Sequence, residues 1–251
     1  MRLSLVSLLA LSFLVRMADA QEKGAGDGKW KEAMQAYKDD FKKKSVRFKK
    51  RAIEALPASD IRTITFIIEE EKLLSSKDWW IRYTAASQLA KIRDPELRQK
   101  LLTYAKSSDP KIREGIMTTL AISNDPADAP VILEALKDST WQVRRMACWA
   151  AGQQKVKEAV DPMIEMIHWV DKGGNERQKG DPHPRVQGVC LYNLEEITGQ
   201  TQFADDADQW RTYWARNKDK TLPKVKRFGV GDFGDVKGIE FNDTVGPGGT
   251  G

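Results

Sequence analysis

Apolar residues in the middle of the chain recur with two periods, one of a helix and one much longer. Within each segment they fall at i, i+4 and i+8, the spacing of one buried helix face. Three such segments start 31 residues apart, and a fourth starts 43 residues after the third. This pattern predicts an array of helical repeats, in which each unit packs on its neighbours. The apolar sets are Ile81, Ala85 and Leu89; Ile112, Ile116 and Leu120; Val143, Ala147 and Ala151; and Val186, Cys190 and Leu194.

A second helix is predicted in each repeat, because another apolar set follows every first helix. Upstream of these units, residues 48–56 fit the first-helix pattern and the apolar run 61–74 supplies a looser second helix. Prolines stand where a connection should give way to a new helix, and no segment alternates with period two over a useful length. The second-helix sets are Leu101, Leu102 and Ala105; Ile132, Leu133 and Leu136; and Met163, Ile164 and Ile167.

The starts of the first helices share a motif, Asp-x-x-Ile/Val-Arg. It is complete in 78–82 and 109–113, whereas the third copy has Thr140 in place of the acid and the fourth has Gln187 in place of the arginine. The motif resembles the HEAT repeat over residues 48–194, and the family it resembles is that of bacterial exported proteins with PBS-lyase-like HEAT repeats. The resemblance implies an all-α fold, a right-handed α-solenoid of HEAT-type helical hairpins with about four to five repeats and helical caps.

The same resemblance favours a noncatalytic scaffold that binds a protein or peptide, since such arrays present an extended surface. HEAT-like chromophore lyases are the enzymatic alternative. The two histidines of the chain, His168 and His183, match no strong metal template, and no phosphate-binding loop or G-x-S-x-G element is present. We therefore predict no catalytic residue, no cofactor and no metal; partner identity and oligomeric state do not follow from the sequence.

The two ends of the chain differ from the array. Residues 1–20 combine an apolar run with a small-x-small site at Ala18-Asp-Ala20, which predicts a signal peptide and export to the periplasm or the medium. That run is shorter than the ~20 apolar residues of a membrane span, and no later segment is predicted to cross a bilayer. The predicted organisation is a flexible leader at 21–29, a solenoid with capping helices at 30–218 and a Gly-rich, loosely ordered tail at 219–251.

The chain has two cysteines, Cys148 and Cys190, and each lies on the packed face of a first helix. They stand at different offsets from the starts of their repeats, which argues against good bridge geometry between neighbouring helices. An exported protein is permitted a disulfide but does not require one. We expect two buried free thiols rather than a disulfide.

Positive charge is concentrated near the N-terminal end of the array. The full chain has a formal net charge of +5, and residues 42–51 contain seven lysines and arginines. Such a cluster is compatible with a polyanion partner. Solvated helix faces beside the buried stripe of Phe48, Ala52 and Leu56 explain it more simply, and export makes nucleic acid an unlikely partner.

Two groups of residues are candidates for partner binding. Trp79, Trp80 and Trp141 lie at the starts of first helices, where tryptophan serves either as a binding hot spot or as packing. The extra 12 residues before the fourth repeat form a polar insertion, which is either a binding loop or a tolerated surface loop. The insertion candidates are Trp169, Lys172, Asn175 and Arg177.

Arginine recurs at one position of the first helix, as Arg82, Arg113 and Arg144. A ladder of this kind is suited to gripping the carboxylates of an acidic peptide. We favour a structural ladder, in which Asp78 and Asp109 pair with these arginines and satisfy exposed helix ends.

Overall fold

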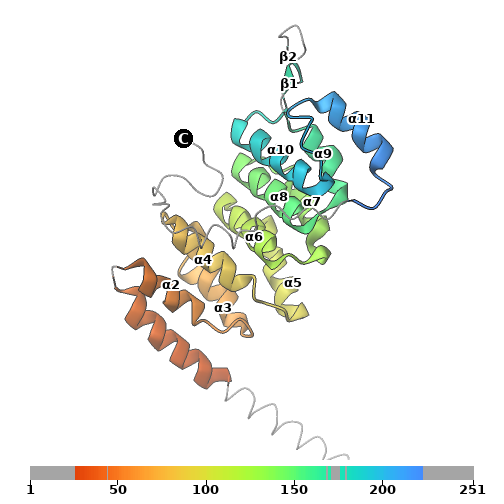
Figure 1. Ribbon diagram of the computed structural model, residues 1–251. Coiled ribbons are helices and arrows are strands. Elements are labelled where there is room, and N and C mark those ends of the chain that lie inside the picture. Colours follow the sequence, from red (N-terminus) through yellow and green to blue (C-terminus); the bar gives the residue numbers. More distant parts are fainter. Residues whose placement is uncertain (1–25, 44, 168, 171–175, 179, 223–251) are drawn as a thin grey trace, which may run out of the picture.

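The computed structural model describes residues 26–43, 45–167, 169–170, 176–178 and 180–222, and these form two rows of helices (Figure 1). Residues 26–41 form an N-terminal helix. The first-helix row contains α2 (Val46–Glu54), α4 (Trp79–Leu89), α6 (Pro110–Ser123), α8 (Trp141–Gln154) and α10 (Pro184–Thr198). The predicted all-α solenoid is confirmed.

The second row is built from shorter helices. A π-helical turn, η1 (Phe66–Glu70), and a 3-10 turn, η2 (Leu73–Ser75), continue α3, so the looser second helix predicted over 61–74 is broken into pieces. The row contains α3 (Ile61–Thr65), α5 (Pro95–Thr103) with η3 (Tyr104–Lys106), η4 (Pro126–Asp128) with α7 (Ala129–Ala135), and η5 (Lys157–Ala159) with α9 (Val160–Ile164). The closing helix α11 (Ala207–Asn217) packs against α9.

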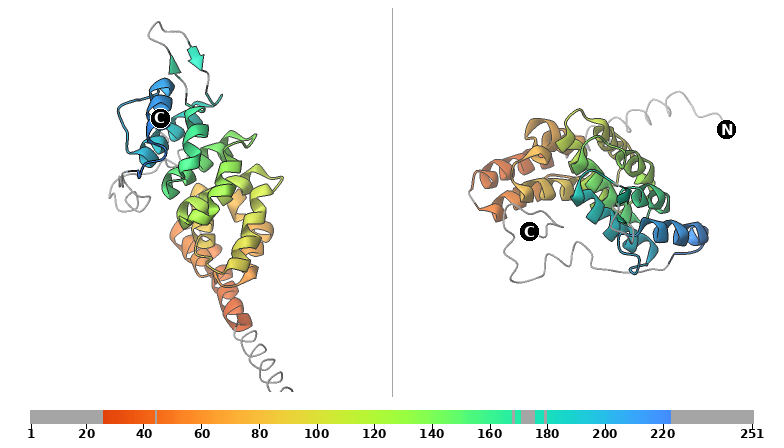
Figure 2. Two further views of the ribbon diagram at one scale, coloured as in Figure 1. Left: turned by 90° about the vertical axis from the view of Figure 1, so that its right-hand side faces the viewer. Right: turned by 90° about the horizontal axis from the view of Figure 1, so that it is seen from above.

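The rows are curved along the length of the array. Seen from above, α4, α6, α8 and α10 lie on the inner side of the curve, and the second row lies outside them (Figure 2). The first helices are therefore the elements that present side chains to the hollow of the solenoid.

Aspartates and prolines start these helices as the sequence predicts. The Asp78 carboxylate accepts the backbone N–H groups of Trp80 and Ile81, and that of Asp109 accepts the N–H of Lys111, so both are N-caps. Proline occupies the first turn of α5, α6 and α10. Helices α6, α8 and α10 end at Asn124, Lys155 and Gly199 in the left-handed conformation.

One apolar core runs along the array between the two rows. The predicted first-helix positions supply most of it: in the four sets that define the repeats all residues are buried except Ile112, which is half-buried and packs against the cluster. In the expected upstream stripe, Ala52 and Leu56 are buried, whereas Phe48 is half-buried and lies outside the cluster. At the ends, Tyr37 of the N-terminal helix and Trp210 and Trp214 of α11 belong to the same core. Both ends of the repeat array are therefore capped by helices.

The prediction of two free thiols is wrong. Cys148 on α8 and Cys190 on α10 form a disulfide, with their Cα atoms 5.3 Å apart. Small residues allow this close approach of the two helices: Ala147, Ala151 and Gly152 of α8 are all buried. The different offsets of the two cysteines in their repeats therefore do not prevent the bridge.

The insertion before α10 forms a hairpin in part. Strand β1 (Trp169–Val170) pairs antiparallel with β2 (Glu176–Gln178), so that Trp169 lies opposite Gln178. Lys172 and Asn175 lie outside the described residues, as do the side chains of Trp169 and Arg177. The expected signal peptide and most of the expected leader and tail also lie outside them. Within the described ranges, every helix falls short of the length and apolar character that a membrane crossing requires.

Candidate interaction site

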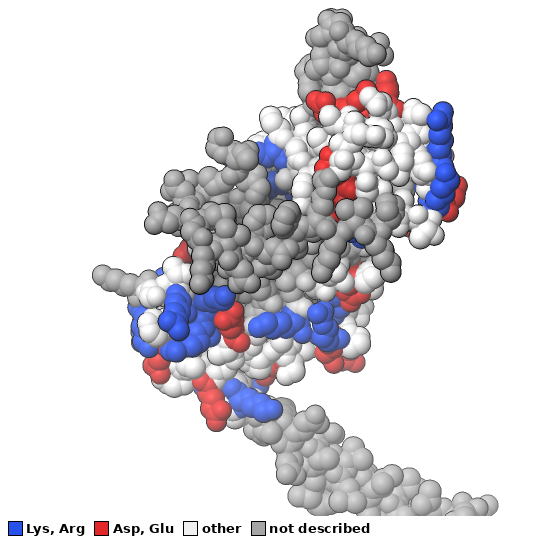
Figure 3. All heavy atoms as spheres, in the orientation of Figure 1, with Lys and Arg blue, Asp and Glu red and all other residues white. Residues whose placement is uncertain are grey.

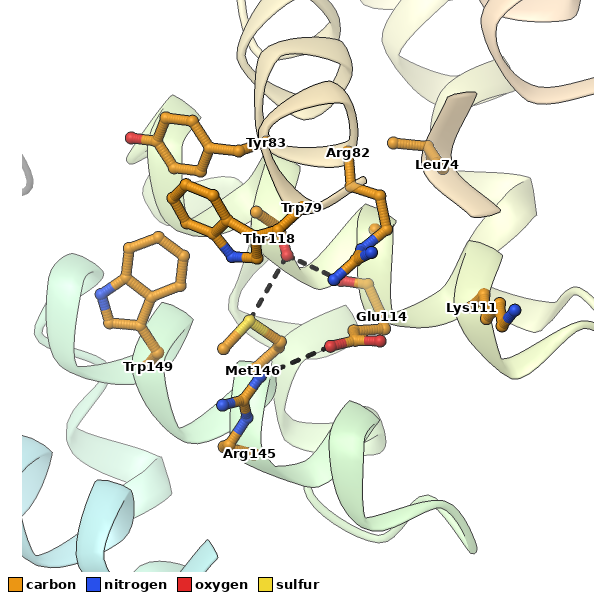
Figure 4. A pocket seen from close by; sticks show the side chains of 11 residues that line it. Leu74, Trp79, Arg82, Tyr83, Lys111, Glu114, Thr118, Arg145, Met146 and Trp149 are labelled. Atoms are coloured by element: carbon orange, nitrogen blue, oxygen red, sulfur yellow. Dashed lines mark hydrogen bonds and ion pairs between the residues drawn. The ribbon is translucent and has the colours of Figure 1, made fainter. Parts of the chain in front are cut away.

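A groove crosses the inner face of the array over α4, α6 and α8 (Figure 4). Aromatic and charged side chains line it together, which is uncommon for a surface that only contacts solvent. We refer to it as the α4–α8 groove; its lining includes Trp79, Arg82, Tyr83, Glu114, Arg145 and Trp149.

The groove arises because equivalent positions of successive first helices face the same side. Tyr83, Glu114 and Arg145 are each 31 residues apart, so they occupy one repeat position on α4, α6 and α8. Thr118 and Trp149 occupy another, one helical turn further on. These positions fall outside the buried apolar stripe, and their side chains therefore line the inner surface.

The aromatic side of the groove is held in place by ring contacts. The Trp79 ring stacks on Tyr83 at a centroid distance of 5.4 Å and meets Trp80 edge-on at 4.5 Å. Burial raises the pKa of the Tyr83 hydroxyl, and a hydrogen bond with Ser87 opposes this shift. Trp149 lies across the groove from Trp79, beside Met146 (Figure 4). Held rings lose little side-chain entropy on binding, which makes them suitable anchors.

Arg145 is the most buried cation of the groove. Only 17% of its side chain is exposed, and Nη2 lies 3.5 Å from Glu114 Oε1. Its buried Nε has no hydrogen-bond partner among the described residues. Burial lowers the pKa of Arg145, the neighbouring charges of Arg185 and Arg82 lower it further, and Glu114 opposes them. Positive charge is thus crowded around one acidic group.

Arg145 also lies beside an aromatic pair formed by Trp141, at the start of its own helix α8, and His183, the N-cap of α10. Its guanidinium carbon is 5.7 Å from the centroid of the Trp141 ring. That ring stacks on His183 at 3.6 Å and an interplanar angle of 8°. Trp141, one of the predicted partner-binding residues, therefore packs against its neighbours in the adjacent repeat.

Two of the three ladder arginines are neutralised by acids of the following repeat. Arg113 donates from Nε and Nη2 to both carboxylate oxygens of Asp138, at 2.7 and 2.9 Å. Arg144 holds Asp181 in the same bidentate way, with 2.9 Å between Nη2 and Oδ1. Each also donates from Nη1 to the carbonyl oxygen six residues before it. These two arginines join successive repeats.

The charges of the ladder follow from these contacts. The hydrogen bond to Asp138 raises the pKa of Arg113, and that to Asp181 raises the pKa of Arg144. Burial would raise the pKa of Asp138, but hydrogen bonds from Arg113 and from the Thr140 N–H outweigh it and lower that pKa. The Arg113–Asp138 pair is therefore ionised at neutral pH.

Arg82 differs from the other two arginines. It donates to the carbonyl oxygens of Ser76 and Lys77, at 2.8 and 3.2 Å, but no carboxylate of the described residues pairs with it. The predicted pairing of Asp78 and Asp109 with the arginines is not observed. Both aspartates instead cap the helices that carry Arg82 and Arg113. Arg82 instead reaches over the groove toward Glu114 (Figure 4).

The lysine-rich cluster lies at the opposite end of the array from α11. Lys and Arg side chains gather over α2 (Figure 3), but part of their charge is balanced locally. Asp40 accepts hydrogen bonds from Arg51 and Lys43, which lower its pKa. Lys50 lies 3.8 Å from Glu54. No described group of three or more His, Cys, Asp or Glu side chains is arranged to hold a metal ion.

Part of the chain that forms the groove matches a known protein family. Residues 70–141 match the family described as HEAT repeats. The matched segment includes α4 and α6 and ends at the first residue of α8, so two of the three helices of the groove lie in the part of the chain that is similar to HEAT repeats. No curated protein matches the chain. HEAT repeats are helical scaffolds that commonly mediate protein interactions.

Of the six groove residues named first, four were not predicted from the sequence: Tyr83, Glu114, Arg145 and Trp149. The repeat motif is defined by residues that recur between repeats, whereas these positions carry a different residue in every repeat. The repeat register itself contained the signal. An aromatic or charged residue at a solvent-facing position, where the other repeats have unlike residues, marks a surface that packing does not determine.

Proposed function

We propose that this protein is an exported, noncatalytic scaffold that binds a partner protein through the α4–α8 groove. The observation that carries the proposal is the combination, on the inner face of the array, of fixed aromatic rings with three cations, Arg82, Lys111 and Arg145, that share the single lining acid Glu114. Aromatic residues and arginine are enriched where protein interfaces gain most of their energy.

Export is supported by the composition of residues 1–20 and by the Cys148–Cys190 disulfide, since disulfides persist in oxidising compartments. The resemblance to bacterial exported proteins of the PBS-lyase-like HEAT family supports the same location. The insertion hairpin, which carries Trp169, Lys172, Asn175 and Arg177, would extend the binding surface beyond the groove.

Partner capture tests the proposal. Purified protein is immobilised and exposed to the envelope and secreted fractions of its own source cells, and retained proteins are identified by mass spectrometry. Trp149→Ala should reduce retention of a specific partner at least about tenfold, because a buried aromatic anchor is worth ~2 kcal/mol or more at an interface. Circular dichroism should show unchanged helical content.

Ile61→Ala is the matched control, since Ile61 is an apolar residue of α3 whose side chain is 50% exposed. It should retain the partner as the unmodified protein does. A variant without residues 172–179 tests the hairpin separately. If that deletion abolishes retention and Trp149→Ala has no effect, the groove is not the binding site.

A further inference from the structure

We propose that the α4–α8 groove binds a carboxylate group of an acidic, aromatic-containing segment of the partner, held between Arg82 and Arg145. The inference rests on the proposed function and specifies its chemistry. It follows from Arg82, the ladder arginine with which no acid of the described residues pairs.

The missing acid can be located by comparing the repeats. Asp138 and Asp181 each stand two residues before an N-cap and accept the backbone N–H of that cap residue, at 2.8 Å from Thr140 and 2.9 Å from His183. Each carboxylate also holds the ladder arginine of the preceding repeat. Each of these aspartates therefore accepts the backbone N–H of a cap residue and also neutralises an arginine of the preceding repeat.

Ser107 occupies the same place before the N-cap Asp109. It is 31 residues before Asp138, as Arg82 is 31 residues before Arg113. The Ser107 hydroxyl oxygen accepts the Asp109 N–H at 3.2 Å, so the hydrogen bond to the cap residue is retained. A hydroxyl group carries no charge, so Ser107 cannot form with Arg82 the ion pair that Asp138 forms with Arg113.

The groove therefore has more positive than negative charge. Arg82, Lys111 and Arg145 line it, and Glu114 is the acid among its lining residues. Glu114 contacts Arg145 at 3.5 Å, which is longer than the 2.7 to 2.9 Å of the Arg113–Asp138 pair. A cation withdrawn from water without a full partner is unfavourable, and an incoming anion relieves that cost.

A carboxylate is the anion that fits this arrangement. Guanidinium groups bind carboxylates in bidentate geometry, as Arg113 and Arg144 already do within the chain. The rings of Trp79, Tyr83 and Trp149 lie beside the cations and offer an apolar surface that a free inorganic anion would not cover (Figure 4). An acidic side chain with an aromatic neighbour would contact both the arginines and the aromatic rings of the groove.

The test restores the missing acid. In Ser107→Asp, the new carboxylate should pair with Arg82 as Asp138 pairs with Arg113, and so compete with the ligand. Ser108→Asp is the matched control: Ser108 is exposed, and the substitution adds the same charge one residue away. The probe is a fluorescein-labelled peptide, acetyl-Gly-Glu-Phe-Gly-Glu-Phe-Gly-amide, with its glutamine counterpart, and binding is followed by anisotropy.

We expect the purified protein to bind the glutamate peptide about tenfold or more tightly than the glutamine peptide, as charge-assisted pairing predicts. Ser107→Asp should weaken binding of the glutamate peptide about tenfold and leave the glutamine peptide unaffected, whereas Ser108→Asp should change neither by more than about twofold. Competition by inorganic phosphate should be weak, because phosphate leaves the aromatic surface exposed. The Ser107→Asp protein should melt at or above the temperature of the unmodified protein, which shows that it is folded.

Equal binding of the two peptides, or equal effects of Ser107→Asp and Ser108→Asp, would overturn the carboxylate site. The scaffold proposal would survive that result if Trp149→Ala still abolished partner capture, so the two can fail separately. Residues 223–251 include Asp232, Asp235, Glu240 and Asp243. If a variant that ends at residue 222 bound the glutamate peptide much more tightly, the occupant would be this chain's own tail, and the assignment to a partner would be wrong.

Discussion

Gly152 determines how closely α8 and α10 approach each other. A Cβ atom at this position would lie 1.8 Å from Asn193 Oδ1, a distance at which the side chain of Asn193 must move. Gly188 on α10 has no such neighbour, since nothing lies within 4 Å of its virtual Cβ. Two glycines in neighbouring helices therefore stand in opposite environments.

We predict that alanine has opposite effects at the two positions. Gly188→Ala should stabilise the protein by up to ~1 kcal/mol, the usual advantage of alanine over glycine inside a helix. Gly152→Ala should destabilise it by about 1–3 kcal/mol, because the added methyl group overpacks the helix contact. Urea unfolding followed by circular dichroism measures both. A similar gain for both variants would show that α8 and α10 lie farther apart than described.

For single residues, the sequence predicted which residue types recur, but not which side chains pair with one another. The recurring arginines were evident from the motif, and so were the aspartates at the helix starts. Asp78 and Asp109 cap helices, however, whereas Asp138 and Asp181 pair with the arginines. The acid that reaches the arginine of the preceding repeat stands two residues before the N-cap, at Asp138 and Asp181, and not at the N-cap itself.

The disulfide links two first helices across the insertion. Cys148 and Cys190 are separated by 42 positions, and the loop they close contains α9 and the β1–β2 hairpin. A cross-link over such a loop limits the freedom of the unfolded chain. It therefore secures the fourth repeat to the third where the regular 31-residue spacing is interrupted.

We predict that the double substitution Cys148→Ala and Cys190→Ala lowers the free energy of unfolding by about 2–5 kcal/mol, as removal of a native disulfide does. Dithiothreitol should lower the melting temperature of the unmodified protein and leave that of the double variant unchanged. Mass spectrometry after maleimide treatment provides an independent check. Modification of both cysteines without prior reduction would contradict the disulfide.

The helices of the array could be predicted because their apolar positions recur over several turns. The hairpin could not, since strands of two and three residues carry no periodic signal. The disulfide could not either, because it depends on the distance between two packed helices. Sequence spacing fixes the phase of each helix, while interhelix distance follows from side-chain volumes at the contact, such as those of Ala147 and Gly152.

The α4–α8 groove is a property of the whole array rather than of any one repeat. Trp79, Glu114 and Arg145 come from three helices, and they converge only because the first helices stack with a constant offset on the inner side of the curve. The sequence predicted Trp79 and Arg82 as separate candidates. Their place in one groove required the curvature and the stacking, which the repeat motif does not encode.

Local stability should vary along the array in a way that reflects its linear construction. Each unit of a solenoid packs only on its neighbours, so a unit with neighbours on both sides opens less often than one at an end. Helices α4, α6 and α8 each have first helices packed on both sides; α6 is the central first helix of the five, and the disulfide further secures α8 to α10. The N-terminal helix and α11 are at the two ends.

We therefore predict slowest amide hydrogen exchange in α6 and α8, intermediate rates in α4, and fastest exchange among the helices in residues 26–41 and α11. Exchange followed by mass spectrometry of proteolytic fragments measures this order. Equal protection in all helices would show instead that the array opens as one cooperative unit. The predicted order also favours the groove as a binding surface, because its central helices would hold Arg82, Arg145 and the aromatic rings in fixed positions before a partner arrives, and a site fixed in advance loses less entropy on binding.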